Sequence, residues 1–132
     1  MARHPKASFL FVDQDLCWLA ALRRASKDLP GPKHFARSAE EALSMVRTYE
    51  PAVVVSGYTL PEGDGLTLLE KVQEQHPTVA CILHTSRPAK QLRAVRNIAL
   101  VEKDGAPGRL EAVLRALWVA LTGKLPPSRV EH

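Results

Sequence analysis

The sequence predicts one α/β domain built around a parallel sheet. Short apolar runs alternate with segments in which apolar residues recur every three or four positions, the pattern of strands alternating with helices. The run AVVVS at 52–56 is apolar almost throughout, as expected of a central strand covered on both faces. The chain has 132 residues, 45% of them hydrophobic, which suffices for one sizeable core. We expect five strand and helix pairs over 8–122, an N-terminal extension at 1–7 and a tail or linker at 123–132.

The first half of the domain is predicted to hold three strands and two helices. The first strand is SFLFV at 8–12, and a helix follows from about Asp15, after which leucines recur at helical spacing. A weaker strand covers about 33–36. Ser38 and Glu41 form a capping-box pattern, which predicts that the second helix begins there. The apolar run described above is the third strand.

The second half is predicted to continue the same alternation. Asp64 follows the turn PEGDG and is placed to cap a third helix. Pro107 is typical of the first turn of a helix, and Gly123 is typical of a helix end. The remaining elements are a strand at 78–84, a short helical segment at about 88–97, a strand at 98–103 and a helix at about 107–122.

Composition restricts the class of protein. No segment approaches the roughly 18 apolar residues that a membrane helix needs, so we expect a cytoplasmic protein without membrane contact. Cys17 lies in a helical pattern and Cys81 in a strand pattern, and we expect both to be reduced core thiols. A net charge of +4 is compatible with an acidic protein, nucleic acid or anionic lipid, but it selects none of them.

Polar side chains are expected to gather at one edge of the sheet. In a doubly wound parallel sheet, functional side chains lie at the carboxyl ends of the strands. The residues at these ends include Asp13, Gln14, Asp15, Ser56, Gly57, Tyr58, His84, Thr85 and Lys103. An acid, a hydroxyl and a lysine therefore converge there, while the third strand ends in a glycine where a reactive side chain is expected.

The stretches that carry these residues resemble CheY-like receiver domains of two-component response regulators. The resemblance covers about 8–122 and rests on FLFVDQD, PAVVVSGYTLPEGDGLTLLEKV, LHTS and VEK. It implies a flavodoxin-like (βα)5 fold, doubly wound, whose parallel five-stranded sheet has the strand order 2-1-3-4-5. It also implies phosphoryl transfer from a histidine kinase to an Asp after the third strand. In the family, acidic residues hold Mg²⁺, and a lysine and a hydroxyl contact the phosphoryl oxygens.

The residues that match the family's site depart from its pattern. By the resemblance, Asp13 and Gln14 match the acidic pair, Thr85 the switch hydroxyl, Lys103 the lysine and Gly57 the phosphoacceptor. Glycine cannot accept a phosphoryl group, and Gln14 removes one charge from a cation that prefers anionic oxygens. We therefore expect no catalytic residue, no cofactor and at most weak Mg²⁺ binding at Asp13.

Two further departures concern the switch. Leu100 stands three residues before Lys103, where the family commonly has a Tyr or Phe that moves with the switch. The short spacing between Thr85 and Lys103 implies a shortened fourth helix or loop. Lys103 is a leftover of the site, the partner of a salt bridge with Asp13 or a site for an anionic ligand, and of these three alternatives we favour the salt bridge. We expect His84 to be a packed or edge histidine, since no Cys and His spacing supports zinc.

The favoured interpretation is a pseudo-receiver signalling domain that is not an enzyme and is not phosphorylated. It would act in a two-component or phosphorelay pathway through a fixed surface, with a sensor, an output domain or a second copy as its partner. That surface would include Arg87, Lys90, Arg93 and Arg96, at three-residue steps on the fourth helical segment, together with Leu100. The alternative interpretation of these cations is a solvated charged face.

Two other functions are alternatives at this point. VDQD also resembles the DxD signature of haloacid-dehalogenase-type phosphatases, in which Asp13 would be the nucleophile and Asp15 the general acid in Mg²⁺-dependent hydrolysis. Leu16 and Cys17 follow, where that family prefers a small, turn-forming pair. The other alternative is charge-driven nucleic-acid binding, although no helix-turn-helix, zinc-finger or RNA-binding signature accompanies the basic residues.

Overall fold

The computed structural model describes residues 8–93, 95–103 and 108–123. The strands of its main sheet are β1 (Phe9–Val12), β2 (Lys33–Ala36), β3 (Val53–Ser56), β6 (Ala80–Thr85) and β7 (Ile98–Glu102). The helices are α1 (Leu16–Ala25), α2 (Ala39–Tyr49), α3 (Gly65–Gln75) and α4 (Gly108–Thr122). A small antiparallel hairpin of β4 (Thr59–Leu60) and β5 (Gly63–Asp64) follows β3.

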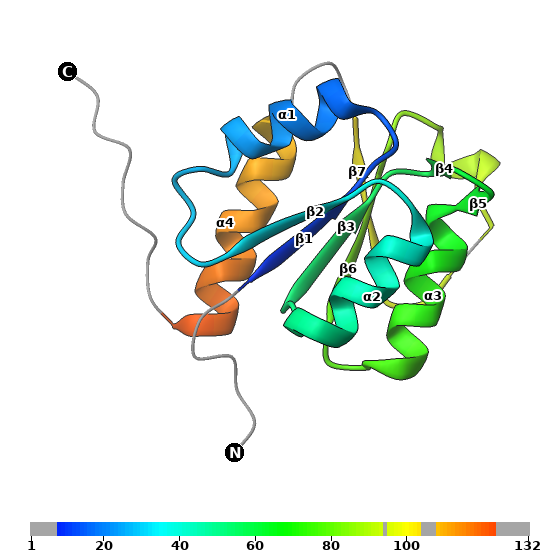
Figure 1. The fold of residues 1–132 in the computed structure, drawn as a ribbon. Coiled ribbons are helices and arrows are strands. Elements are labelled where there is room, and N and C mark those ends of the chain that lie inside the picture. Colours follow the sequence, from blue (N-terminus) through cyan, green and yellow to red (C-terminus); the bar gives the residue numbers. More distant parts are fainter. Residues whose placement is uncertain (1–7, 94, 104–107, 124–132) are drawn as a thin grey trace.

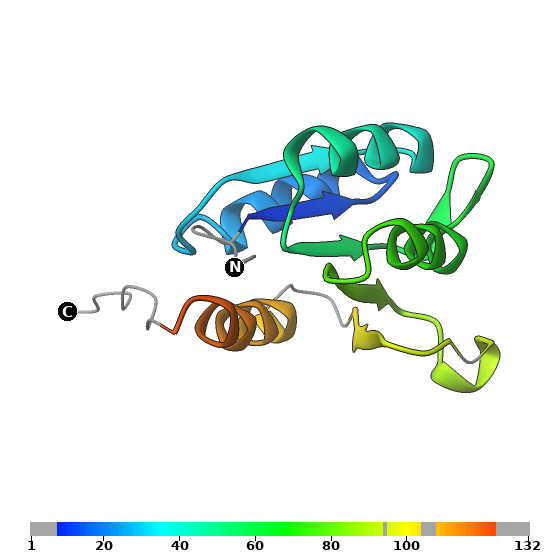
Figure 2. The same ribbon diagram turned by 90° about the horizontal axis from the view of Figure 1, so that it is seen from below.

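All five strands of the main sheet are parallel, in the order β2-β1-β3-β6-β7. Helices α2 and α3 cover one face of the sheet, and α1 and α4 cover the other (Figures 1 and 2). Without the hairpin in the count, this is the predicted order 2-1-3-4-5. The predicted α/β class and doubly wound topology are therefore confirmed.

Three helices begin at the caps that the sequence predicts. The side chains of Asp15, Ser38 and Asp64 accept hydrogen bonds from backbone N–H groups two or three residues further on, at 2.8 to 3.3 Å. These bonds satisfy N–H groups that have no partner within the helix. Gly123, with φ +72°, follows α4 in the left-handed conformation that often ends a helix. The cap of α1 lies three residues after the end of β1, and the cap of α3 is the last residue of the hairpin, so both also fix the backbone of the polar edge.

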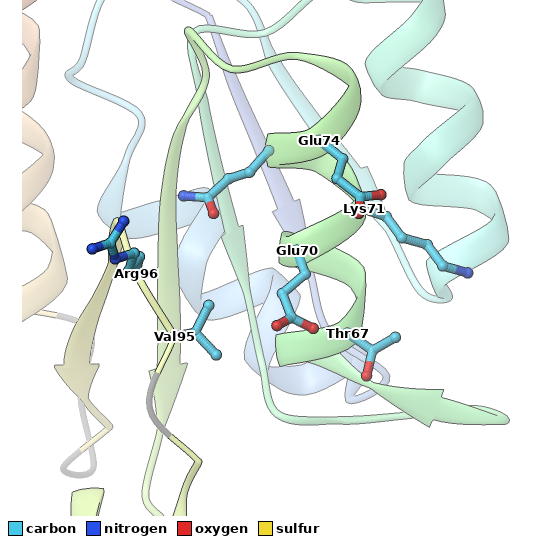
Figure 3. Close-up of a pocket in the computed structure, with 7 residues that line it drawn as sticks. Thr67, Glu70, Lys71, Glu74, Val95 and Arg96 are labelled. Carbon is cyan, nitrogen blue, oxygen red and sulfur yellow. The ribbon is translucent and has the colours of Figure 1, made fainter.

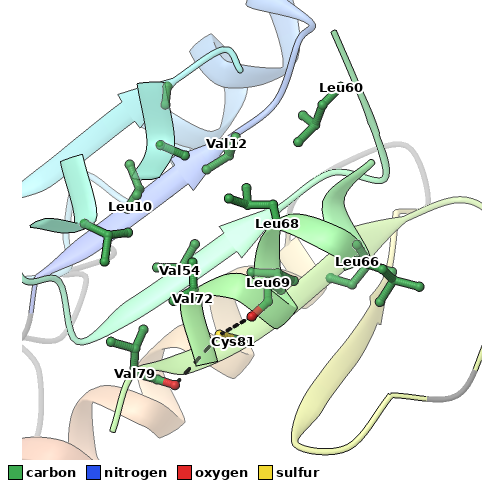
Figure 4. Packing of buried hydrophobic residues seen from close by; sticks show 14 residues of the cluster. Leu10, Val12, Val54, Leu60, Leu66, Leu68, Leu69, Val72, Val79 and Cys81 are labelled. Atoms are coloured by element: carbon green, nitrogen blue, oxygen red, sulfur yellow. Dashed lines mark hydrogen bonds between the residues drawn. The ribbon is translucent and has the colours of Figure 1, made fainter. Parts of the chain in front are cut away.

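Two apolar layers hold the helices against the sheet. Along β1, Phe9 and Phe11 face α1 and α4, whereas Leu10 and Val12 face α2 and α3. The second layer is drawn in Figure 4, where leucines of α3 pack over the middle strands. Burying such a side chain contributes about 1.5–3 kcal/mol, so the central strands are the most firmly held part of the molecule.

The predicted helix over 88–97 is wrong for most of its length. Among the described residues of this range, only Ala89–Gln91 is helical, as a single 3-10 turn, and Leu92 is already extended. The connection must run back along the sheet, because Ile98 pairs with Cys81 at the far end of β6. Turns at both ends of the connection, including Asn97 with φ 64°, take up part of its length, and the 3-10 turn has no side-chain cap. The shortened connection that the resemblance implies is present.

Of the two cysteines predicted to be core thiols, one is buried and the other is exposed. Cys81 is buried as expected, and burial raises the pKa of its thiol to about 12, but Cys17 is exposed. Cys17 is not a core residue because it lies in the first turn of α1 on the side that faces solvent. Both cysteines are free thiols.

Among the described residues, no helix is long and apolar enough to cross a membrane. The predicted extension at 1–7, residues 124–132 of the predicted tail at 123–132, and Pro107 lie outside the described residues.

Gly65 is the position where we expect a small substitution to do most damage. A Cβ there would collide with the backbone carbonyl oxygen of Gly57 and would lie 2.8 Å from the Ser56 hydroxyl. We expect Gly65→Ala to lower the free energy of unfolding by about 2 kcal/mol in urea denaturation, because backbone atoms must move apart. The matched control is Gly63→Ala, which has open space around the new methyl group and should stay within about 0.5 kcal/mol of the parent. Equal losses in both variants would contradict this account.

Candidate functional site

A polar cleft of about 390 Å³ lies at the carboxyl edge of the sheet. It is lined by Asp13, Gln14, Asp15, Gly57, Tyr58, Thr59, Thr85, Ser86, Arg87 and Lys103. All five residues that the resemblance assigns to a degenerate phosphorylation pocket are among them. They follow or end β1, β3, β6 and β7, so the parallel topology brings together groups that are up to 90 residues apart.

Inside this cleft, Asp13 and Lys103 form an ion pair. The Lys103 Nζ donates to Asp13 Oδ2 at 3.0 Å, and the two side chains are 24% and 7% exposed, respectively. The other carboxylate oxygen of Asp13 accepts the backbone N–H of Asp15 at 2.9 Å. The ammonium also lies 4.8 Å from the ring centre of Trp18, within the range of a cation–π interaction. Both oxygens of Asp13 are therefore engaged by this protein's own groups.

Asp13 also takes up the space that a side chain at position 57 would need. A Cβ built on Gly57 would lie 2.6 Å from Asp13 Oδ2 and 3.2 Å from its Cγ. The backbone of Gly57 is held in place, because its N–H donates to the carbonyl of Val12 at 2.8 Å. The acceptor position is thus filled by the carboxylate of the neighbouring strand, which already has a lysine as its counter-ion.

The hydroxyl groups around Gly57 are engaged as well. Ser56 is fully buried, and its hydroxyl donates to the carbonyl of Gly57 at 2.8 Å. Thr85 is buried, and its oxygen accepts the backbone N–H of Arg87 at 3.1 Å. The Arg87 guanidinium lies 4.5 Å from the ring centre of Tyr58, so these two side chains form one wall of the cleft. The hydroxyls of Ser56 and Thr85 therefore already have partners within the protein.

The oxygen donors of the cleft do not fit the Mg²⁺ that the family resemblance implies. Asp15 accepts the backbone N–H groups of Cys17 and Trp18 as the cap of α1, and Asp13 is paired with lysine. Gln14 offers a neutral amide in place of a second carboxylate. Within residues 8–93, 95–103 and 108–123, no group of three or more His, Cys, Asp or Glu is arranged to hold a metal ion.

His84 and Trp18 form the apolar side of the ion pair. His84 is 1% exposed, and its ring centre lies 5.5 Å from that of Trp18, so the prediction of a packed histidine is confirmed. Trp18 was not among the predicted site residues. The signal that could have identified it is a large aromatic residue one turn into the first helix, directly after the acidic strand end.

The four cations predicted as one helical stripe are separated in the structure. Arg93 binds Glu70 of α3 through both of its terminal nitrogens, at 2.7 and 2.8 Å, and this hydrogen bonding lowers the pKa of the Glu70 carboxyl. Arg87 stacks on a tyrosine, as described above. Lys90 lies in the 3-10 turn, and Arg96 lies in the turn before β7, both exposed. The prediction of a continuous basic helix face is wrong because the helix itself is absent.

Two further hollows flank the connection between β6 and β7. The larger, about 670 Å³, lies between α3 and the segment of Val95 and Arg96 (Figure 3). Glu70, Glu74 and Lys71 line it from the helix, so its charges are mixed and favour no single class of ligand. The smaller, about 230 Å³, is an apolar groove. It is lined by Leu66, Leu83, Ala89, Leu92, Arg93, Val95, Ile98 and Leu100.

We expect Lys103→Met to destabilise the fold by leaving a buried carboxylate without its cation. A fully buried pair loses about 3–5 kcal/mol when one partner is removed, and the partial exposure of Lys103 reduces this to about 2 kcal/mol. Urea denaturation of Lys103→Met, Asp13→Asn and the double variant should give a positive coupling between the two sites. Lys71→Met, at an exposed position of α3, is the control and should change stability by less than about 0.5 kcal/mol. Strict additivity of the two single variants would contradict the ion pair.

Comparisons with known proteins agree on one structural class. A signal receiver domain of an HD domain-containing protein from Pseudomonas fluorescens Pf-5 matches with a TM-score of 0.80 and 30% identity, over 90% of this chain and 99% of that chain. A CheY-like response regulator receiver domain from Methanospirillum hungatei JF-1 matches with a TM-score of 0.77 and 20% identity, over 89% and 98% of the two chains.

A third match is to RcsB from Salmonella enterica serovar Typhimurium, bound to the promoter rprA in the presence of the phosphomimetic BeF3-. Its TM-score is 0.72 and its identity 21%; the match covers 85% of this chain but only 61% of RcsB. No family model matches the sequence, and no curated protein sequence matches it. The first match, at 30% identity over nearly the whole of a receiver domain, extends beyond a shared fold. The chain belongs to the receiver domains of two-component response regulators.

Proposed function

We propose that this receiver-like signalling domain is not phosphorylated and acts by presenting a fixed surface to a protein partner. The observation that carries the proposal is the position of the Asp13 carboxylate, which lies where a side chain of residue 57 would stand and is paired with Lys103. Phosphoryl transfer to a receiver needs an acceptor carboxylate, a divalent cation and a positive group that is available to the transferred phosphoryl.

Each of these three requirements meets an obstacle in the cleft. Gly57 has no carboxylate, and the oxygen ligands for a cation are reduced to one lysine-paired aspartate and one helix cap. The positive charge of Lys103 is already balanced by Asp13 at 3.0 Å. A phosphoryl group would have to displace Asp13 from the lysine, and a displaced Asp13 would remain in a largely buried site without a counter-ion.

The phosphatase alternative receives less support from this geometry. A general acid must reach the leaving group with its carboxyl, but Asp15 is committed to two backbone N–H groups of α1. A nucleophilic Asp13 would have to leave Lys103 and the Asp15 backbone before it could attack. Receiver domains are in general signalling domains without catalytic turnover, in agreement with this assignment.

The partner surface that we propose surrounds β7. Arg87, Lys90 and Arg96 are exposed there, together with Leu100, whose side chain is 43% exposed. Arg93 belongs to the surface only through its stem, because its guanidinium is bound to Glu70. DNA contact is a property of the longer RcsB protein in its complex, and we do not extend it to this domain.

The first test is the intact mass of the protein after incubation with Mg²⁺ and a small phosphodonor. We expect no phosphoryl adduct, because the acceptor carboxylate is missing and the lysine is occupied. A receiver domain that keeps the acceptor Asp, incubated in parallel, establishes that the donor is active. A stoichiometric adduct on the protein would falsify the proposal.

The second test restores the missing groups one at a time. We expect Gly57→Asp alone to remain unphosphorylated, because its side chain meets Asp13 and the cation still lacks a second carboxylate. Addition of Gln14→Asp should permit an adduct, since a bound cation would draw the carboxylates away from Lys103. The matched control is Gly57→Asn with Gln14→Asp, which has the same size but cannot form an acyl phosphate. Efficient phosphorylation of the single variant would show that Asp13 is not an obstacle.

A further inference from the structure

We propose that the outer edge of β7 binds an extended, acidic segment of a partner protein as an added strand. One apolar side chain of that segment would occupy the groove beside Leu100. This inference rests on the proposed function, because it specifies the chemistry of the partner that the fixed surface would recognise.

The first observation is the open edge of the sheet. Within the described residues, β7 is the last strand in the sheet order and is paired on one side only, with β6. The backbone N–H of Lys103 donates to the carbonyl of Thr85 at 2.9 Å, so Lys103 points its backbone groups toward β6. Backbone groups alternate in direction along a strand, and therefore those of Ile98, Leu100 and Glu102 point away from the sheet. Such a row of outward donors and acceptors is a template for one more strand.

The second observation is the apolar groove on the same edge. Ile98 and Leu100 are two residues apart, so their side chains lie on one face of β7. Leu66 of α3 and Leu83 of β6 line the groove with them, and the whole hollow is about 230 Å³. A helix across this face would cover it, but the connection here forms only the turn at Ala89–Gln91. A strand added to β7 would place alternate side chains directly over the groove.

The third observation is the charge around the groove. Lys90 and Arg96 are exposed and follow the groove residues Ala89 and Val95 in the chain, and no described carboxylate lies within salt-bridge distance of either cation. Arg93, whose side chain also lines the groove, is neutralised by Glu70. Two cations beside an apolar hollow, neither with an ion-pair partner among the described residues, favour an acidic segment, because complementary charge raises the association rate and excludes basic segments.

The same charges argue against a second copy of this chain as the occupant. A two-fold pairing of β7 with β7 would bring the cationic rims of both copies to one interface. Like charges at an interface are unfavourable, and the whole chain carries a net charge of +4. A partner segment with glutamate or aspartate around an apolar residue meets no such repulsion.

The test uses a labelled synthetic peptide in which valine alternates with serine between glutamates at both ends. Fluorescence anisotropy should show saturable binding to the protein, and an otherwise identical peptide with lysines at its ends should bind at least about tenfold more weakly. Raising the salt concentration should weaken the acidic peptide's binding. Equal binding of both peptides, or no binding of either, would overturn the proposal.

Two pairs of variants locate the site on the protein. Leu100→Glu should weaken binding of the acidic peptide about tenfold, whereas Leu16→Glu, at a leucine 59% exposed on α1, should leave it unchanged. Lys90→Glu with Arg96→Glu should weaken binding by a similar factor without touching the groove, and Arg24→Glu with Arg47→Glu, at exposed positions of α1 and α2, is the control with the same change of charge. Far-ultraviolet circular dichroism establishes that each variant is folded. Equal effects of a variant and its control would place the peptide elsewhere.

Backbone pairing is tested separately by N-methylation of the peptide. Methyl groups on the alternate amides that face β7 should abolish binding, while methyl groups on the other alternate amides should leave it intact. If neither set matters, the segment does not add as a strand.

Sedimentation tests whether a second copy of the chain is the occupant. A wild-type dimer that Leu100→Glu dissociates would show that it is, and would overturn the proposal. None of these outcomes bears on the mass measurement, so the failure of this inference is distinct from failure of the proposed function.

Discussion

The ion pair between Asp13 and Lys103 is the interaction on which the rest of the polar edge depends. It joins the ends of the first and last strands of the central sheet and brings a carboxylate beside Gly57. The pair persists in a largely buried place because each charge has a second partner, a backbone N–H for Asp13 and the Trp18 ring for Lys103. The charges of Asp13 and Lys103 thereby balance each other inside the cleft and form a structural contact.

The glycine at position 57 has two effects: the acceptor carboxylate is missing, and Asp13 can contact Lys103. A side chain at position 57 and the observed carboxylate of Asp13 cannot share the same space. Glycine therefore removes a reactive group and at the same time allows the neighbouring aspartate to reach the lysine. The backbone around Gly57 is held by a hydrogen bond to the carbonyl of Val12 and by close contact with Gly65.

The sequence predicted most of the fold and the location of the cleft. Strand runs, three helix caps and the parallel order are local or topological patterns, and the structure confirms them. The connection after β6 was mispredicted because Arg87, Lys90 and Arg93 repeat at a spacing that mimics a helix face, while the segment has turns at both ends and no side-chain cap. Two features could not be predicted: the ion pair between Arg93 and Glu70, and the position of Asp13 beside Gly57. Both depend on distances between segments that are far apart in the sequence, and the spacing of apolar residues carries no information about those distances.

The absent helix after β6 has a further consequence for solubility. An uncovered edge strand with apolar residues such as Ile98 and Leu100 is a site where identical chains can join and aggregate. Lys90 and Arg96 lie beside that edge and oppose aggregation, because each chain added to a stack of sheets would bring more positive charges close together. The cations that favour an acidic partner thus also protect the free protein, and the open strand can persist without becoming a nucleus for fibres.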